Sequence, residues 1–269
     1  MRIADNGSGI ARDDMPLALA RHATSKISSL DDLERVNSLG FRGEALASIA
    51  SISRMNLVSR VAAERHAWRV ETEGGALFPI QPAALEQGTV IEVTDLYFNT
   101  PARRKFLKSE ATEFAHCDEN FKRIALSRAD VAFSLMHNGR AQWRLAPTDA
   151  VKRIGELMGE EFAAEALRLD EGGEALRLWG MAAKPTFSRT ARDAQYFFVN
   201  GRFVRDKLVA HAIRPRNPHL AFCAAVNIVP EQDTIGRQIN RSGQNLILKP
   251  LNNRRVVVNT IWEVEKRGK

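Results

Sequence analysis

Two glycine-containing segments constrain the fold of this chain more than any other feature of its sequence. Residues 5–9 (Asp-Asn-Gly-Ser-Gly) directly follow a short β-type stretch, and residues 40–43 (Gly-Phe-Arg-Gly) directly precede a helical pattern of apolar residues. Asn-Gly and Ser-Gly pairs are typical of tight turns, and glycine permits close backbone approaches that other residues forbid. The sequence therefore predicts a strand over residues 2–4 that ends in a turn, and a helix that begins at a glycine loop.

The spacing of apolar residues predicts the helices around these two segments. A helical stripe follows the glycine loop over residues 42–52, and a shorter helix is expected after Asp13 or Asp14, with another near residues 29–36. Ser109 can cap a longer helix. The inward face of that longer helix is expected to carry Phe114, Cys117, Phe121 and Ile124.

Alternating and β-branched patterns predict the strands. They cover residues 55–61, 66–72 and 89–94, and the pair Asn138-Gly139 between two alternating segments predicts a β-hairpin. We place a domain boundary at residues 147–149, where a new helix begins. The expected organisation is a first domain over residues 1–148 and a second over residues 149–269, both of the α+β class.

The net charge of +7 is unevenly distributed along the chain. Residues 214–269 contain ten Lys and Arg against four Asp and Glu, so nearly all of the excess lies there. The overall basicity is therefore weak evidence for nucleic-acid binding by the rest of the chain. Cys117 and Cys223 show no C-x-x-C spacing, which argues against a disulfide framework or a zinc site and favours inert core residues. No membrane span or secretory signal is visible, so we expect a cytoplasmic protein.

The two glycine segments could form the two sides of a nucleotide pocket. A carboxylate at a strand end, followed by glycines, can face the amino group of a base, although an ordinary Asn-Gly turn has the same sequence. Backbone N–H groups at a helix start attract polyphosphate, and Arg42 would add charged donors, although a glycine loop can also serve packing alone. The chain contains no G-x-x-x-x-G-K-[ST] phosphate loop.

Four longer motifs give the chain a family resemblance. They are residues 21–26 (Arg-His-Ala-Thr-Ser-Lys), 40–46 (Gly-Phe-Arg-Gly-Glu-Ala-Leu), 99–106 (Asn-Thr-Pro-Ala-Arg-Arg-Lys-Phe) and 199–202 (Val-Asn-Gly-Arg). In this order and spacing they resemble the N-terminal region of the MutL family of DNA mismatch repair proteins, as far as about residue 213. The resemblance implies a layered ATP-binding domain of the gyrase, heat-shock chaperone, histidine kinase and MutL (GHKL) superfamily, followed by a ribosomal-S5-like domain.

The resemblance also implies roles for individual residues, with ATP and Mg²⁺ as cofactors. Asp5 matches the carboxylate that holds the adenine amino group, with Gly7 and Gly9 shaping the base pocket and Thr89 supporting it. The lid that orders over the nucleotide matches Thr24, Ser25 and Lys26, and the phosphate loop matches Phe41, Arg42 and Gly43.

Two departures from the family pattern lie near the ends of the sequence. The family's helix with the general-base Glu and the magnesium-binding Asn precedes the strand with which this sequence starts, so we expect impaired hydrolysis and no catalytic residue of this kind. Glu44 is a poor substitute, because the family carries Glu there beside its true base. Residues 214–269 lack the expected His-Pro-Ala-Lys turn, since Leu220 follows His219. Their poor local patterning favours a reading-frame or gene-assembly error over adaptive divergence.

DNA contact is the family's other implied property. Arg202, Arg205 and Lys207 match basic positions that would contact DNA phosphates in a salt-sensitive way, although a solvated strand edge has the same pattern. The resemblance implies that the chain binds double-stranded DNA, a MutS-like mismatch-recognition protein and downstream nicking and unwinding enzymes, and forms a homodimer on ATP binding. Two alternatives are a non-enzymatic DNA-binding fragment and a non-functional truncation. The residues 103–105 (Arg-Arg-Lys) are interpreted as a solvated helix start.

Overall fold

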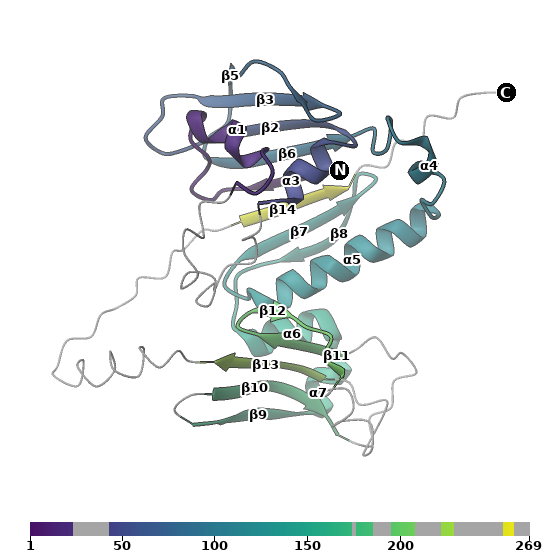
Figure 1. The fold of residues 1–269 in the computed structure, drawn as a ribbon. Helices are drawn as coiled ribbons and strands as arrows, with labels where there is room; N and C mark the ends of the chain where they lie inside the picture. The colour runs from purple at the N-terminus through teal and green to yellow at the C-terminus, as the bar shows by residue number, and fades with distance from the viewer. Residues whose placement is uncertain (24–42, 174–175, 185–194, 208–221, 229–254, 261–269) are drawn as a thin grey trace. The chain divides into compact units, whose positions relative to one another are not determined.

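The computed structural model describes residues 1–23, 43–173, 176–184, 195–207, 222–228 and 255–260. The chain divides into two compact units (Figure 1). The first unit comprises Met1–Glu119, Val131–Ala146 and Asn252–Lys269, and the second comprises Asn120–Asp130 and Pro147–Leu251. Within the described ranges, no helix is long and apolar enough to cross a membrane.

The first unit is built on a mixed β-sheet. Its strands are β1 (Arg2–Asp5), β2 (Arg54–Arg60), β3 (Ala67–Glu73), β4 (Ala76–Leu77), β5 (Gln81–Ala83), β6 (Gly88–Thr94), β7 (Ala132–His137), β8 (Arg140–Leu145) and β14 (Arg255–Thr260). They follow the order β4-β3-β2-β6-β1-β14-β7-β8, and β5 pairs with β3. The predicted strands over residues 2–4, 55–61, 66–72 and 89–94 are confirmed to within two residues at each end.

Strand β14 lies inside this sheet, between β1 and β7, although it comes from the far end of the sequence. It pairs antiparallel with β1 and parallel with β7. Val256 therefore lies between Asp5 on β1 and Phe133 on β7. Residues 214–269, which the sequence analysis marked as divergent, thus contribute one strand to the first unit. Their other described segment, β13, belongs to the second unit.

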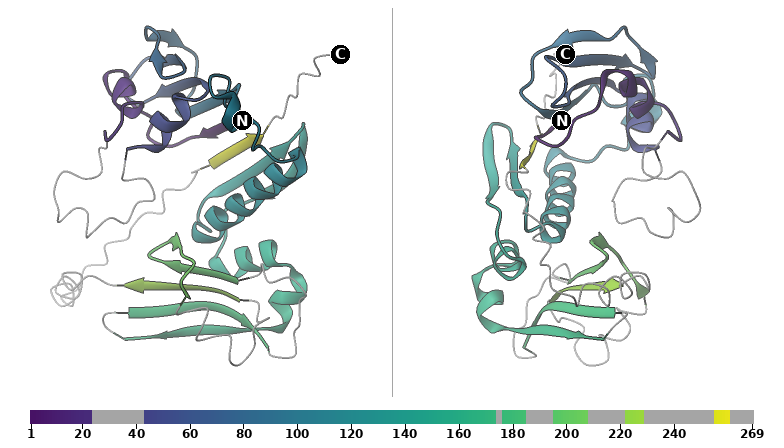
Figure 2. Two further views of the ribbon diagram at one scale, coloured as in Figure 1. Left: turned by 45° about the vertical axis from the view of Figure 1, so that its right-hand side comes forward. Right: turned by 90° about the vertical axis from the view of Figure 1, so that its left-hand side faces the viewer.

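Short helices cover one face of the first sheet. The 3₁₀ turn η1 (Arg12–Asp14) leads into α1 (Met15–Ala18), and α3 (Ala45–Ala50) follows the second glycine segment. Figures 1 and 2 show α1 and α3 on the same face. Their buried residues pack on β2, β3 and β6 in a core formed by Met15, Leu19, Ala50, Met55, Leu57, Val70 and Val93.

The predicted helices are present near their expected places, with two corrections. Asp14 occupies the N-cap position of α1 as predicted, but its side chain makes no capping hydrogen bond, since the chain enters α1 through the 3₁₀ turn. Helix α3 ends at Ala50 rather than at residue 52, and the chain turns directly into β2. The expected helix near residues 29–36 lies outside the described residues.

Helix α5 (Glu110–Ser127) is shared between the two units, since the division falls after Glu119. The Ser109 hydroxyl accepts the Thr112 N–H at 3.4 Å, which confirms the predicted cap. Phe121 is buried as predicted, but Ile124 is 47% exposed and its expected inward position is wrong. The buried residues Phe121, Ala125 and Leu126 define the inward face, and Ile124 lies outside that stripe.

The predicted hairpin at Asn138-Gly139 is confirmed as β7–β8. Both turn residues have positive φ, 48° and 76°, as a type I′ turn requires. After the hairpin the chain enters the second unit at Pro147, where Asp149 caps α6 (Ala150–Met158) by accepting the Lys152 N–H at 3.0 Å. That hydrogen bond also lowers the pKa of the Asp149 carboxyl.

The second unit carries its own sheet and core. Its strands are β9 (Ala166–Gly172), β10 (Leu176–Ala183), β11 (Gln195–Val199), β12 (Arg202–Phe203) and β13 (Phe222–Ile228), in the order β12-β11-β13-β10-β9. Helices α6 and α7 (Glu160–Glu165) bury Ile154, Met158 and Phe162 in a core that also holds Cys223. The mixture of helices and sheets confirms the predicted α+β class.

The two cysteines differ in their surroundings. Cys223 is buried in the second core, so its predicted core position is confirmed, and burial raises the pKa of its thiol to about 12. Cys117 is only half-buried and lies outside both core clusters, so its predicted core position is wrong. Partial burial still raises the pKa of the Cys117 thiol.

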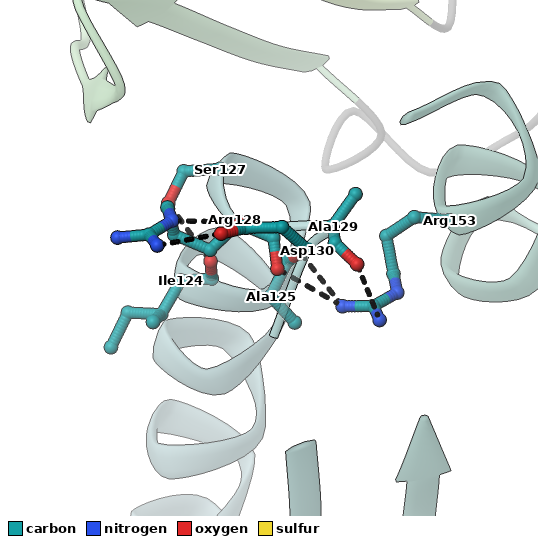
Figure 3. A network of polar contacts seen from close by, with 7 residues as sticks. All are labelled: Ile124, Ala125, Ser127, Arg128, Ala129, Asp130 and Arg153. Carbon is teal, nitrogen blue, oxygen red and sulfur yellow. Dashed lines mark hydrogen bonds and ion pairs between the residues drawn. The ribbon is translucent and has the colours of Figure 1, made fainter. Parts of the chain in front are cut away.

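A buried arginine joins α5 to α6 within the second unit (Figure 3). The Arg153 guanidinium is fully buried and donates to the carbonyls of Ala125 at 3.1 Å, Ala129 at 3.3 Å and Arg128 at 3.5 Å. These carbonyls lie at the C-terminus of α5 and just beyond it, where a helix leaves its last C=O groups without intrahelical donors. Burial lowers the pKa of Arg153, which Glu156 at 3.4 Å partly counteracts.

We expect Arg153→Met to destabilise the second unit strongly. The substitution keeps most of the side-chain volume but leaves several buried carbonyls without donors, which costs about 2–4 kcal/mol of unfolding free energy. Arg128→Ala serves as the control, because its pair with Asp130 is exposed and contributes little. Urea unfolding followed by circular dichroism measures both variants. Equal unfolding midpoints for the two variants would contradict this role of Arg153.

Candidate functional site

Two predicted site residues, Asp5 and Thr89, lie in one row across the first sheet together with a third polar residue, Ser59. Asp5 at the end of β1 is in register with Thr89 on β6, and Thr89 is in register with Ser59 on β2. Cross-strand neighbours of this kind have side chains close enough to interact. The pairing register therefore brings Asp5 and Thr89, which are 84 positions apart in the sequence, into one local site.

Ser59 connects the two predicted residues to the loop after β1. Its hydroxyl lies 2.9 Å from the Thr89 hydroxyl, donates to the Gly88 carbonyl at 3.0 Å and accepts the Ile10 N–H at 2.8 Å. Ser59 is fully buried and Thr89 is only 8% exposed, so these hydrogen bonds satisfy groups that water cannot reach.

Ser59 was missed by the sequence analysis. A signal was present, because Ser59 continues the buried alternation of Met55 and Leu57 along β2. A hydroxyl at such a position needs a buried partner. Only the register shows that this partner is Thr89.

The loop over residues 5–9 is held by its own carboxylate and by Gln87. Asp5 Oδ1 accepts the Gly7 N–H at 2.8 Å, and Gln87 Nε2 donates to the Gly7 carbonyl at 3.2 Å. Among the described residues, Asp5 Oδ2 has no hydrogen-bond partner. Asp5 therefore presents one fixed and one available carboxylate oxygen at the end of β1.

Two glycines permit the close backbone contacts around this loop. A Cβ on Gly9, at φ 77°, would lie 2.1 Å from the Arg60 carbonyl oxygen, and one on Gly88, at φ 101°, would lie 2.0 Å from the Asp5 carbonyl oxygen. Neither position accepts another residue without moving a strand. Gly9 is thus needed for the fold of the loop, beside its predicted role in shaping a pocket.

The predicted lid and phosphate-loop residues lie mostly outside the described part of the chain. This holds for Thr24, Ser25, Lys26, Phe41 and Arg42.

The described residues that flank this segment meet. A Cβ on Gly43, at φ 61°, would lie 2.2 Å from the Ala23 carbonyl oxygen, and His22 Nδ1 lies 3.3 Å from Glu44 Oε1. Residues 22–23 and 43–44 therefore lie in contact with each other.

A cavity of about 320 Å³ lies elsewhere in the first unit. It is lined by Leu19, Arg21, Ala47, Ala50, Ser51, Thr72, Gly74, Gly75 and Leu77. None of these is a predicted site residue, so the cavity does not correspond to the predicted pocket. The described ranges also contain no group of three or more His, Cys, Asp or Glu residues placed to hold a metal ion.

The basic residues predicted to contact DNA lie on and after β12 in the second unit. Arg202 is half-buried, whereas Arg205 and Lys207 are exposed. The Arg205 guanidinium lies 6.0 Å from the Phe203 ring centroid, and that of Arg123 lies 4.2 Å from the same centroid. The fold thus adds Arg123 from α5 to this region. No local sequence signal connects it to a strand about 80 positions later.

Comparisons with known proteins place this geometry in context. A family model described as "DNA mismatch repair protein, C-terminal domain" matches residues 154–217. The DNA mismatch repair protein MutL of Thiobacillus denitrificans is 52% identical over 240 residues, covering 86% of this chain and 40% of that protein. MutL of Pseudomonas putida is 58% identical over 219 residues, covering 80% of this chain and 35% of that protein. The chain thus spans two fifths or less of the length of these curated relatives.

Two solved structures of DNA repair proteins have folds similar to that of this chain. The Aquifex aeolicus MutL ATPase domain complexed with ADP superposes with a TM-score of 0.63 at 26% identity, covering 91% of this chain and 86% of that one. The N-terminal domain of a DNA repair protein has a TM-score of 0.68 at 20% identity, which supports the fold alone. These matches confirm the predicted layered GHKL class.

Gly88→Ala is expected to disturb β1 and with it Asp5. The new Cβ would lie 2.0 Å from the Asp5 carbonyl oxygen, so the strands must separate, at about 2–4 kcal/mol of unfolding free energy. Gly139→Ala is a matched control, since φ is also positive there and no atom lies within 4 Å; it should cost only about 1 kcal/mol. Urea unfolding and amide hydrogen exchange in β1 measure both. Similar losses in the two variants would refute the close contact.

Proposed function

Because the chain belongs to the MutL family of DNA mismatch repair proteins, we propose that its first unit binds ATP beside the end of β1. The observation that carries this proposal is the hydrogen bonding of the Asp5 carboxylate. Oδ1 accepts the Gly7 N–H at 2.8 Å, whereas no described residue donates to Oδ2, which can therefore accept a hydrogen bond from a ligand. The exocyclic amino group of adenine is such a donor, and a charged acceptor gives a strong hydrogen bond.

The surroundings of Asp5 hold its carboxylate in place. Gly7 and Gly9 allow the tight path of the loop, because a Cβ at Gly9 would lie 2.1 Å from the Arg60 carbonyl oxygen and one at Gly7 would lie 2.9 Å from Asp5 Oδ1. The buried Ser59–Thr89 hydroxyl pair holds β2 and β6 in register beside β1. This arrangement fixes the carboxylate before the ligand arrives, which reduces the ordering that binding requires.

We assign the phosphates to the segments that meet at Ala23 and Gly43. Thr24, Ser25 and Lys26 would close over the nucleotide, and Phe41, Arg42 and Gly43 would hold its phosphates, as the family resemblance implies. The contact between Ala23 and Gly43 supports this assignment, because Ala23 directly precedes the lid motif and Gly43 is the last residue of the phosphate-loop motif.

The chain's own contribution to magnesium binding and hydrolysis is small in this proposal. Mg²⁺ is usually held by substrate phosphates with one or two carboxylates, and the residues that the structure describes contain no cluster of three or more His, Cys, Asp or Glu side chains placed to hold it. Glu44 follows the phosphate segment, but its Oε1 lies 3.3 Å from His22 Nδ1. We propose that the 269-residue polypeptide binds ATP more readily than it hydrolyses it.

The repair function proposed here follows the pattern of the MutL relatives. We propose that ATP binding couples mismatch recognition by a MutS-like protein to downstream nicking and unwinding enzymes, through a homodimer formed when nucleotide binds. A cytoplasmic location belongs to the same proposal. The high identity to MutL proteins supports it, over the two fifths or less of their length that the chain spans.

A second candidate function is DNA binding by the second unit. The observation that favours it is the pair Arg123 and Arg205, which face the Phe203 ring at 4.2 and 6.0 Å, beside Arg202 and Lys207. Such a surface would contact DNA phosphates without reading sequence.

Asp5→Asn tests the ATP proposal. The amide replaces one acceptor oxygen with a donor that opposes the adenine amino group, so we expect ATP affinity to fall at least about tenfold, equal to about 1.4 kcal/mol. GTP carries an oxygen at the corresponding ring position, so its affinity should fall less or rise. Titration calorimetry with both nucleotides measures the change.

Asp13→Asn is the control for this experiment, because Asp13 is an exposed acid on η1. Unchanged ATP affinity in Asp5→Asn, with the control also unchanged, would exclude the adenine assignment. Phosphate release measured on the same samples tests slow hydrolysis. Turnover equal to that of a full-length relative would contradict that part of the proposal.

Replacing Arg202, Arg205 and Lys207 with Gln tests DNA binding. We expect weaker binding to a labelled duplex and a smaller salt dependence, by about 0.9 in the logarithmic slope per lost phosphate contact. The matched control replaces Lys152, Arg168 and Lys184, which removes the same charge from the same unit. Equal losses in the two triple variants would show a nonspecific charge effect and reject the site.

A further inference from the structure

The cavity of about 320 Å³ in the first unit is lined by helix α3, the chain just after α1 and the β3–β4 hairpin. Leu19 and Arg21 line it after α1, Ala47 and Ala50 line it from α3, and Thr72 lines it from β3. We call this space the hairpin cavity. An apolar cavity of about 150 Å³ already holds a benzene ring. The hairpin cavity is therefore large enough for a ring that carries substituents.

The hairpin cavity is separate from the candidate nucleotide site. The row of Asp5, Thr89 and Ser59 continues to Trp68 on β3, and Thr72 lies four residues further along that strand. At about 3.3 Å per residue, this separation is roughly 13 Å. A ligand in the hairpin cavity would thus contact residues that the ATP proposal does not use.

Small residues keep this space open. On the α3 side the lining residues Ala47 and Ala50 have no side-chain atom beyond Cβ. On the hairpin side Gly74 and Gly75 form the turn between β3 and β4, with φ of 59° and 91°. Positive φ favours glycine, so the turn itself keeps side chains out of this part of the cavity.

Thr72 places a buried hydroxyl in the wall of the hairpin cavity. The residue is 3% exposed, shares the buried face of β3 with Val70 and is in register with Met55 on β2. Its Oγ1 has no hydrogen-bond partner among the described residues. An unsatisfied buried hydroxyl costs free energy that a valine of nearly the same shape would avoid. A ligand group that hydrogen-bonds to Oγ1 would remove this cost.

Arg21 adds positive charge on the exposed side of the hairpin cavity. Arg21 is exposed and forms no ion pair with another described residue. Leu77, which also lines the cavity, is 50% exposed, so this side of the space is open to solvent. The cavity therefore combines apolar walls with a buried hydroxyl and an exposed cation.

Hydrogen bonds hold the chain between α3 and β2, which borders the hairpin cavity. Asn99 Nδ2, on the loop that precedes α4 (Pro101–Arg104), donates to the Ser51 carbonyl at 2.9 Å. The Tyr97 N–H donates to the Ile52 carbonyl at 2.7 Å, and the Gly74 N–H donates to the Ser53 carbonyl at 3.1 Å. A wall that is already fixed loses little freedom when a ligand binds.

We propose that the hairpin cavity binds a small aromatic carboxylate that carries a second polar substituent. The ring lies against the apolar lining, the substituent hydrogen-bonds to Thr72 Oγ1, and the carboxylate pairs with Arg21. A mainly apolar wall with a few polar groups is typical of small-molecule sites, and the volume lies at the lower end of their range of about 300–1,000 Å³. The proposal does not depend on ATP binding.

Titration of para-hydroxybenzoate into the isotope-labelled full chain, followed by amide NMR, tests the proposal. We expect saturable shifts at Thr72 and Ala47, with a dissociation constant of about 5 mM or below for a ligand of this size. Asp5 and Thr89 should not shift. Ala47→Leu fills the hairpin cavity and should abolish binding, whereas Ala45→Leu, at an exposed position of the same helix, should not.

Two related probes separate the polar contacts. Thr72→Val should weaken para-hydroxybenzoate about 5-fold, the loss of one neutral hydrogen bond, and leave benzoate unchanged, because benzoate has no hydroxyl. Arg21→Gln should weaken para-hydroxybenzoate about 2- to 5-fold and leave para-hydroxybenzamide, which has no charge, unchanged. The matched controls Thr94→Val and Arg65→Gln alter exposed residues of the same unit and should bind like the unmodified chain.

Three results would overturn the proposal. The first is the absence of saturable shifts at Thr72, which would leave water as the partner of the buried hydroxyl. The second is an equal loss of benzoate and para-hydroxybenzoate affinity in Thr72→Val. The third is a lower urea midpoint for unliganded Thr72→Val than for the unmodified chain, which would show that the fold itself satisfies the hydroxyl.

Discussion

The close approach of backbones at Gly88 and Gly9 is the constraint on which the candidate nucleotide site depends. At Gly88 the β6 backbone comes so near to the Asp5 carbonyl that no Cβ fits between them, and at Gly9 the loop after β1 meets the end of β2 in the same way. These contacts set the register of β1, β6 and β2. That register in turn places Ser59 against the Thr89 hydroxyl in a buried pair. The position of the Asp5 carboxylate therefore depends on the missing side chains of Gly9 and Gly88 as much as on the Ser59–Thr89 hydrogen bond.

Most elements of the first unit could be predicted because their signals are local. Alternation over six or seven residues defines β2, β3 and β6, and the Asn138-Gly139 turn defines the β7–β8 hairpin. Long-range pairing has no such signal. Nothing in residues 255–260 indicates that they lie beside β1, because any β-branched run could occupy that position. The error at Ile124 has a similar origin, since the buried face of a helix is fixed by its partners and only approximately by its own spacing.

The sequence predicts those residues of the candidate site that belong to short motifs. Asp5, Gly7, Gly9 and Thr89 were identified from motifs, and the structure brings them together at one end of the sheet. The residues that fix them were not identified. Ser59 acts through hydrogen bonds to groups about 30 and 50 positions away, and such a network exists only once the strands are in register.

The position of β14 has a consequence for synthesis on the ribosome. The strand that separates β1 from β7 is made about 250 residues after β1, roughly 10–50 s later at 5–20 residues per second. During that interval the facing edges of β1 and β7 lack the strand that pairs with both of them. Unpaired edges recruit other strands. Completion of the first sheet therefore waits for β14, and until then these two edges are where the nascent chain is open to pairing with other strands.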